Sequence, residues 1–140
     1  MEALYTAKAT TDGGRQGKVT SSDGTLDLTL SMPKSLGGQE KEGSTNPEQL
    51  FAAGYSACFD SALNAVARQF KKRIESKVTS EVSIGKDSEG GFKLAVVLSV
   101  VVNGVSLEEA EELVEQAHSF CPYSKATKGN IDIELKTSLF

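Results

Sequence analysis

Apolar and polar residues alternate in four stretches of the chain, which is the pattern of strands that bury one face. These stretches are residues 26–32, 78–84, 92–102 and 130–137. An Asp-Gly turn signal at 21–24 joins the first stretch to residues 15–20, and a glycine-rich turn at 87–91 joins the second to the third. The pattern predicts an antiparallel sheet in the N-terminal third and a long hairpin in the middle of the chain.

Residues 46–73 have the features of a long helix. Asn46 is a capping side chain, Pro47 takes the first helical position, and Gln49 stands where a capping box would place it. Apolar residues occupy nearly every face up to the basic run 71–73. This distribution indicates a buried central helix rather than an amphipathic surface helix.

A second helix is predicted after the hairpin. Ser106 and Glu109 form another capping box, and an apolar stripe opposite an acidic face continues to Phe120. Pro122 would begin a short further helix. The polar, glycine-bearing residues 33–45 form a long loop of the kind that borders functional sites. The order of strands, helix, hairpin, helix and strand predicts an α+β fold.

Composition is typical of a globular protein. A chain of 140 residues, 39% hydrophobic and 24% charged, is the size of one domain, so residues 1–140 are expected to form a single domain. Basic residues are scattered among acids at a net charge of −4, which gives no field for nucleic acid or anionic lipid. Without a signal-like start or a membrane-length apolar run, the protein is expected to be soluble and cytoplasmic.

The two cysteines are either buried free thiols or a catalytic pair. Cys58 lies twelve positions beyond Asn46, so the helix N-terminus does not acidify its thiol. A free thiol is only about 3% ionised at pH 7, and apolar burial lowers that fraction. A nucleophilic Cys58 therefore needs a cationic neighbour, and an arginine would serve best because it keeps its charge in an apolar pocket.

Two long motifs and one short segment stand out in order along the chain. They are NPEQLFAAGYSACF at 46–59, CPYSKATKGN at 121–130, and GGRQG at 13–17. Together they closely resemble the organic hydroperoxide resistance proteins, a branch of the larger family that includes the osmotically inducible protein C. The order of elements matches over essentially all 140 residues. The Cys-Pro-Tyr form of the second motif favours this branch over its sister branch.

The resemblance implies both a fold and an activity. The fold would be an α+β intertwined homodimer, with long central helices wrapped by antiparallel sheets and two active sites at the subunit interface. An organic hydroperoxide would oxidise Cys58 to a sulfenic acid, and Cys121 would condense with it to a disulfide. Arg15 and Glu48 match the activating pair. A lipoyl-type dithiol carried on a protein would reopen the disulfide, without a bound flavin, haem or other cofactor.

The position of Glu48 raises a geometric question. On one unbroken helix it would lie about 15 Å along the axis from Cys58. Either the first turns are offset, or Glu48 reaches the thiol of the other subunit. Because a carboxylate alone would raise the thiol pKa, we expect Glu48 to hold the Arg15 guanidinium in a two-point pair. The remaining arginine donors would then face the sulfur and the peroxide oxygens.

Other interpretations remain open from the sequence. A sister-branch peroxidase would differ in substrate preference, and a non-enzymatic dimer would bind a hydrophobic ligand and carry incidental thiols. His118 has no second ligand at metal spacing, so it is expected to be a partly exposed helix residue, and no metal site is predicted. Four aromatic residues are more often core than substrate wall. They are Tyr55, Phe59, Phe120 and Tyr123.

Overall fold

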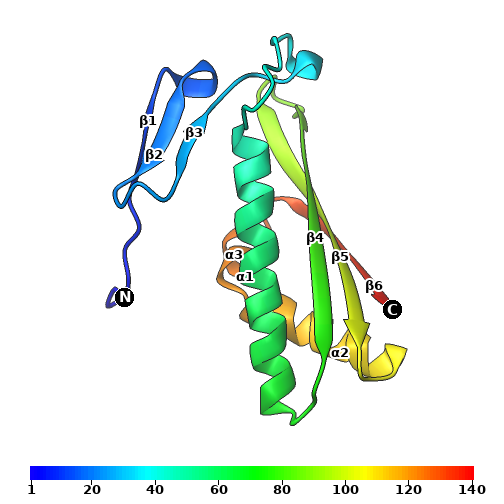
Figure 1. Ribbon diagram of the computed structural model, residues 1–140. Coiled ribbons are helices and arrows are strands. Elements are labelled where there is room, and N and C mark those ends of the chain that lie inside the picture. The colour runs from blue at the N-terminus through cyan, green and yellow to red at the C-terminus, as the bar shows by residue number, and fades with distance from the viewer. The chain divides into compact units, whose positions relative to one another are not determined.

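The computed structural model describes residues 1–140, which group into two compact units, Met1–Leu50 and Phe51–Phe140. Figure 1 shows the elements of each unit. The expectation of a single domain stays a prediction. None of the helices is both long and apolar enough to cross a membrane.

The first unit contains the antiparallel sheet predicted for the N-terminal third, with strand order β1-β2-β3. Its strands are β1 (Ala9–Asp12), β2 (Lys18–Ser21) and β3 (Asp27–Thr29). The hairpin between β2 and β3 turns as its Asp-Gly signal predicts. Gly24 takes a φ of 77°, and the Asp23 carboxylate accepts hydrogen bonds from the Ser21 hydroxyl and the Thr25 N–H, at 2.6 and 3.0 Å.

The strand predicted over residues 15–20 begins only at Lys18. Gly14–Gln16 form a short 3-10 turn, η1, instead. Gly13 precedes it with a φ of 80°, a conformation that L side chains rarely adopt, and a Cβ on Gly17 would fall 1.7 Å from a backbone oxygen. The alternating pattern did not reveal this turn because the glycines, rather than the apolar spacing, determine it.

Residues 33–45 form the predicted loop, interrupted by one 3-10 turn, η2 (Lys34–Leu36). The end of the loop is attached to the sheet. The Thr45 N–H donates to the Thr29 carbonyl at 2.8 Å, and the Ser31 N–H donates to the Thr45 carbonyl at 3.0 Å. The loop therefore returns to the end of β3 directly before the long helix.

The second unit is built on that helix and a three-stranded sheet in the order β4-β5-β6. Its elements are α1 (Pro47–Gln69), β4 (Glu75–Lys86), β5 (Phe92–Asn103), α2 (Leu107–Phe120), α3 (Pro122–Thr127) and β6 (Asp132–Leu139). The residues of α1 up to Leu50 belong to the first unit. In Figure 1, α1 runs lengthwise beside β4 and β5. The two predicted long helices, the short helix beginning at Pro122 and the long hairpin are confirmed.

Both helix starts use the predicted capping side chains, but the capping box expected of Gln49 does not form at α1, where its side chain bonds to Thr45 and not to the Asn46 N–H. The Asn46 carboxamide oxygen accepts the Gln49 N–H at 2.9 Å. The Gln49 side chain accepts a hydrogen bond from the Thr45 hydroxyl at 2.7 Å. At α2 the capping box is complete, because Ser106 and Glu109 each accept the other's backbone N–H through their side chains.

The expectation that all sheets are antiparallel is wrong for one pair of strands. β5 and β4 are antiparallel, but β6 runs parallel to β5, with Val96 opposite Ile133 and Val100 opposite Thr137. The cause is the chain path. Because α2 and α3 cross over between the two strands, β6 enters the sheet in the same direction as β5.

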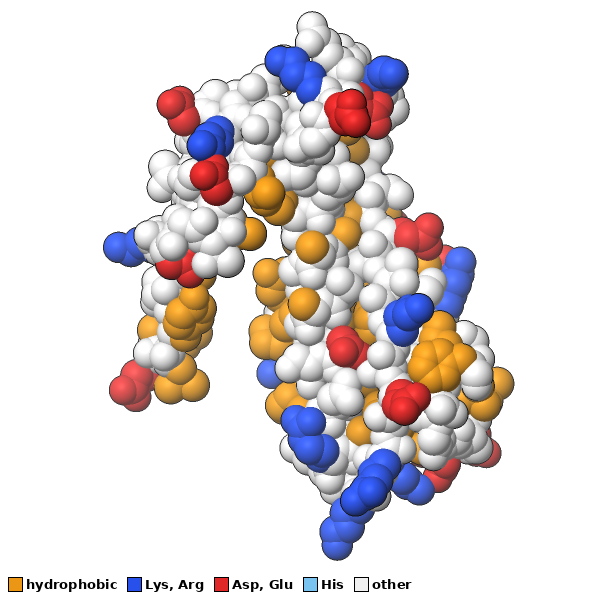
Figure 2. Space-filling view, viewed as in Figure 1, with side chains coloured by type: hydrophobic (Ala, Val, Ile, Leu, Met, Phe, Trp, Pro, Cys, Tyr) orange, Lys and Arg blue, Asp and Glu red, His pale blue; other side chains and the backbone are white.

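The core of the second unit lies between one face of α1, the inner face of β5 and the apolar stripe of α2. Its fully buried side chains include Tyr55, Phe59, Leu63, Leu98 and Val114. Within one chain α1 is not buried on every face, since Ala53 and Ala57 are exposed, so its burial on nearly every face stays a prediction. Figure 2 shows hydrophobic side chains uncovered along the outer surface of the helix.

Candidate active site

The two thiols face each other within the second unit. The Sγ of Cys121 lies 3.5 Å from the Sγ of Cys58, and both cysteines are free. Cys121 is fully buried, whereas Cys58 is half-buried. A disulfide bond is about 2.05 Å long, so the two sulfurs are in contact but not bonded.

The secondary structure explains how residues 63 positions apart meet. Cys58 follows Tyr55 by one turn of α1, on the side of the helix that packs against the core. Cys121 has extended backbone angles and is at once the C-cap of α2 and the N-cap of α3. Pro122 occupies the first position of α3 and favours this break between the helices.

Burial raises the pKa of the Cys58 thiol, because a thiolate is poorly solvated there. The Tyr123 backbone amide acts against burial and lowers the pKa of this thiol. The neighbouring Cys121 acts in the opposite direction, and the net pKa is raised. The surroundings of Cys58 in the second unit therefore favour the neutral thiol at pH 7.

Arg15 and Glu48 meet in the first unit, although they are far apart in sequence. The guanidinium donates from Nη1 to Glu48 Oε2 at 2.8 Å and from Nη2 to Oε1 at 2.6 Å. This is a two-point pair of the kind that arginine forms with carboxylates. The Arg15 side chain is 31% exposed and that of Glu48 is 13% exposed, and Glu48 engages only two of the guanidinium N–H donors.

The pair shifts both pKa values in the directions that favour charge. The hydrogen bond from Arg15 lowers the pKa of Glu48, although desolvation acts against it. The same hydrogen bond raises the pKa of Arg15. Both groups are therefore ionised across the physiological range, and the activating role of the pair stays a prediction. Between Glu48 and Cys58, α1 has no break that would offset its first turns.

A group of hydroxyls beside the thiols was not found from the sequence. The Tyr55 hydroxyl lies 2.9 Å from Ser124 Oγ and 3.1 Å from Thr127 Oγ1. The Nδ1 of His118 lies 2.9 Å from the same Ser124 oxygen. His118 is half-buried, as expected of a helix residue, and burial is the main cause that lowers its pKa.

The four candidate aromatic residues divide between the core and the surface. Tyr55 and Phe59 are fully buried, whereas Phe120 and Tyr123 are 49% and 39% exposed. The Tyr123 ring lies 5.8 Å from the Tyr55 ring, and it approaches α1 at Gly54, where a Cβ would fall 2.8 Å from the tyrosine oxygen. Only the two exposed rings are available to line a substrate surface.

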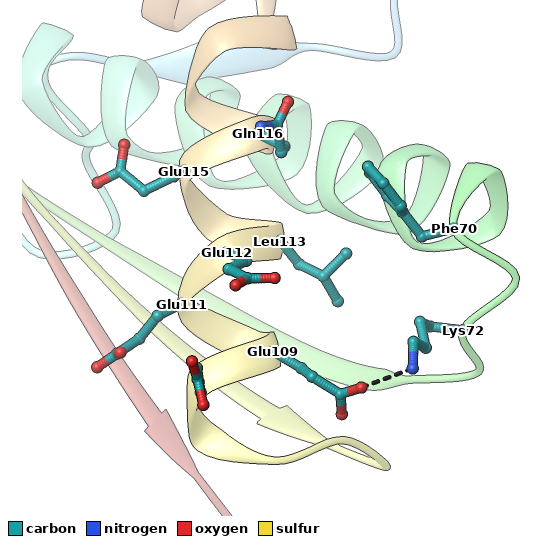
Figure 3. A pocket seen from close by; sticks show the side chains of 9 residues that line it. Phe70, Lys72, Glu109, Glu111, Glu112, Leu113, Glu115 and Gln116 are labelled. Carbon is teal, nitrogen blue, oxygen red and sulfur yellow. Dashed lines mark hydrogen bonds and ion pairs between the residues drawn. The ribbon is translucent and has the colours of Figure 1, made fainter.

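A pocket of about 530 Å³ lies elsewhere in the second unit, and neither cysteine lines it. Figure 3 shows Glu109 reaching from α2 toward Lys72, to which it is paired at 2.6 Å, whereas Glu111 and Glu115 point to the other side of α2. The structure contains no cluster of three His, Cys, Asp or Glu side chains that could hold a metal ion. The facing thiols therefore remain the strongest candidate for chemistry.

The chain therefore has the features of an α+β dithiol protein. It combines two sheets and three helices with two free thiols in contact. Residues 38–136 match the family described as OsmC-like protein, and the chain belongs to this family.

Its similarity to the organic hydroperoxide resistance branch extends over nearly the whole chain. It is 52% identical to organic hydroperoxide resistance protein OhrA of Bacillus subtilis over 98% of both chains. An organic hydroperoxide resistance protein from Elizabethkingia anophelis has a similar crystal structure, with a TM-score of 0.94, 50% identity and full coverage of both chains. The crystal structure of OhrB of Bacillus subtilis superposes with a TM-score of 0.88 at 51% identity, covering 96% of this chain and 99% of that one.

Proposed function

We propose that the protein is a thiol-dependent peroxidase that reduces organic hydroperoxides to alcohols. The observation that carries the proposal is the 3.5 Å contact between two free sulfurs, one half-buried and one fully buried. The substrate class comes from the relatives, which are about 50% identical over nearly their whole length and are named for resistance to organic hydroperoxides.

The reaction has two oxidative steps. The Cys58 thiolate attacks the terminal oxygen of the hydroperoxide, the O–O bond breaks, and the alkoxide that leaves takes up a proton to give the alcohol. Cys58 is then a sulfenic acid. The Cys121 thiolate attacks the sulfur of Cys58, an S–S bond forms, and hydroxide leaves and is protonated to water.

The first step requires an activating cation, because burial raises the pKa of Cys58. We assign this role to Arg15. The Glu48 carboxylate holds two of its donors in fixed directions, and the partly exposed guanidinium keeps others for the sulfur and the peroxide oxygens. The same donors would stabilise the negative charge that develops on the leaving oxygen.

The active form is proposed to be an intertwined homodimer. The outer face of α1 supports this assembly, because Ala53 and Ala57 expose small apolar side chains where another backbone could pack closely. Because α1 is continuous from Pro47 to Gln69, the proposal favours activation of Cys58 by the Arg15–Glu48 pair of the partner subunit. A protein-bound dithiol of the lipoyl type would reduce the disulfide, and no bound cofactor is required.

The proposal is tested by mass spectrometry after one equivalent of cumene hydroperoxide. We expect the native chain to form one intramolecular disulfide and Cys58→Ser to consume no peroxide. Cys121→Ser should react once and accumulate sulfenic or over-oxidised Cys58. Oxidation that begins at Cys121 would reverse the assigned roles.

Turnover distinguishes an enzyme from a binding protein. With dihydrolipoamide in excess, the native chain should consume many equivalents of cumene hydroperoxide or of a fatty-acid hydroperoxide. A non-enzymatic dimer would be oxidised stoichiometrically at most. Faster turnover of hydrogen peroxide than of either organic substrate would contradict the proposed substrate class.

A further inference from the structure

The helix that begins at the second thiol is too short to hold its own position. α3 has six residues, and a helix of that length is not stable in water without tertiary contacts. The buried side of α3 is polar, because Ser124 is fully buried and Thr127 is 7% exposed. Hydrogen bonds from neighbouring elements must therefore supply much of the anchoring.

Ser124 joins three helices at one point. Its hydroxyl lies 2.9 Å from the Tyr55 hydroxyl of α1 and 2.9 Å from His118 Nδ1 at the end of α2. Tyr55 makes a second link to α3 through Thr127 Oγ1 at 3.1 Å. These contacts fix the angle between α2 and α3. The two helices meet at Cys121, which is the C-cap of α2 and the N-cap of α3.

The network can be fully satisfied in either state of the imidazole. When Nδ1 is unprotonated, protons are donated in the order Thr127 to Tyr55 to Ser124 to His118. When Nδ1 carries a proton, the order reverses, and Thr127 donates to the Tyr123 carbonyl at 2.9 Å. Each hydroxyl donates one proton in both cases. A fully satisfied buried network is rigid, so α3 is held in one place.

The same anchoring places the second thiol of the reaction against Cys58. The Cys121 sulfur needs to come only about 1.5 Å closer to reach bonding distance. We propose that Tyr55, Ser124 and His118 are positioning residues for the disulfide step, because they hold α3 so that Cys121 meets the oxidised Cys58 without local unfolding.

The inference rests on the proposed peroxidase chemistry and adds a determinant of its second step. In that step the Cys121 thiolate displaces hydroxide from the Cys58 sulfenic acid. The competing reaction is attack of a second hydroperoxide, which oxidises the sulfenic acid to a sulfinic acid and releases a second alcohol. Holding one thiol beside the other raises its effective concentration, which favours the disulfide.

The test compares Tyr55→Phe and Ser124→Ala with the native protein and with Tyr5→Phe, a matched change at an 84% exposed tyrosine. Rapid quenching after one equivalent of cumene hydroperoxide follows the disulfide step. We expect it to slow about tenfold or more in both network variants, with more sulfinic acid at excess peroxide. Oxidation of Cys58 itself should change less. Tyr5→Phe should behave like the native chain.

The reduction potential of the Cys58–Cys121 disulfide is a second measurement. Loss of folding stability alone would not make this disulfide easier to reduce. A tenfold lower effective concentration of Cys121 makes the disulfide about 30 mV easier to reduce, measured against a dithiol redox buffer. Unchanged disulfide rates and potentials in folded Tyr55→Phe and Ser124→Ala would overturn the positioning role. Failure of the native chain to reduce peroxide would overturn the proposed function instead.

Half-buried His118 provides a test that is less sensitive to folding. Asparagine places a polar group near the position of Nδ1, whereas leucine cannot hydrogen-bond to Ser124. We expect His118→Asn to retain most of the native disulfide rate and His118→Leu to lose it. Equal rates in these two variants would overturn the inference even if the Tyr55 and Ser124 variants did not fold.

Discussion

Replacing Arg15 by lysine keeps the positive charge but removes the two-point pair with Glu48. The guanidinium makes two hydrogen bonds, at 2.8 and 2.6 Å, to different carboxylate oxygens. The lysine ammonium is a point charge on a flexible stem and cannot reproduce both. A hydrogen bond to a charged group contributes about 1.5 to 3 kcal/mol. If the loss of one such hydrogen bond raises the free energy of the transition state by this full amount, the rate of Cys58 oxidation should fall between about ten- and 150-fold.

The assay isolates the first oxidative step. In a Cys121→Ser background, the sulfenic acid is trapped with a dimedone reagent, and its rate of formation is measured with cumene hydroperoxide. Arg68→Lys is the matched control, because Arg68 is exposed near the end of α1 and is 53 positions from Arg15 in the chain. The control should react at the native rate.

The pH dependence separates charge from orientation. Because lysine keeps the charge, the thiolate fraction of Cys58 should change little, and the loss of rate should persist at alkaline pH, where the thiol is ionised. A rate within about twofold of the native rate across the pH range would refute the reasoning, because the pair would then be only structural. If the Arg15→Lys variant reached the native rate only at high pH, the role of Arg15 would instead be to favour ionisation of the Cys58 thiol.

Two further predictions concern stability. The pKa of Glu48 is lowered in the folded chain, so the stabilisation from its pair is fully present above the unfolded carboxyl pKa of about 4.3 and is lost as the pH falls through the lower folded value. The difference in unfolding free energy between the native chain and Glu48→Gln should therefore shrink in acid, and a difference that grows in acid would contradict this sign. Leu63→Ala should cost about 2 to 5 kcal/mol in denaturant unfolding, because the side chain is fully buried. Leu107→Ala, at a residue that is 44% exposed, should cost much less.

The helices and the long hairpin could be predicted because local patterns determine them. The apolar spacing of β4 and β5 and the capping side chains Asn46 and Ser106 act over a few residues. The direction of β6 could not be predicted in this way. A strand alternates with period two whether it is parallel or antiparallel, so only the path of the chain through α2 and α3 decides the direction.

In the candidate site, too, the sequence predicts features that depend on local motifs but not contacts that depend on the path of the chain. The motifs contain the candidate residues, and the structure brings two of them, Cys58 and Cys121, into contact. The role of His118 was not visible, because its partner Ser124 is brought to it only by the turn between α2 and α3 at Cys121. A histidine with no metal ligand nearby gives no signal in the sequence that it will bond to a buried hydroxyl.

The two groups of candidate residues have different tasks in the proposed reaction. The second unit holds the sulfurs in contact but raises the pKa of Cys58, so it is organised for the disulfide step and not for thiol ionisation. The first unit holds an ionised, partly exposed guanidinium. Substitutions at Arg15 should therefore slow Cys58 oxidation and spare disulfide closure, whereas substitutions at Ser124 should do the reverse. A double variant would then show independent losses in the two steps, because the two hydrogen-bonded groups share no residue.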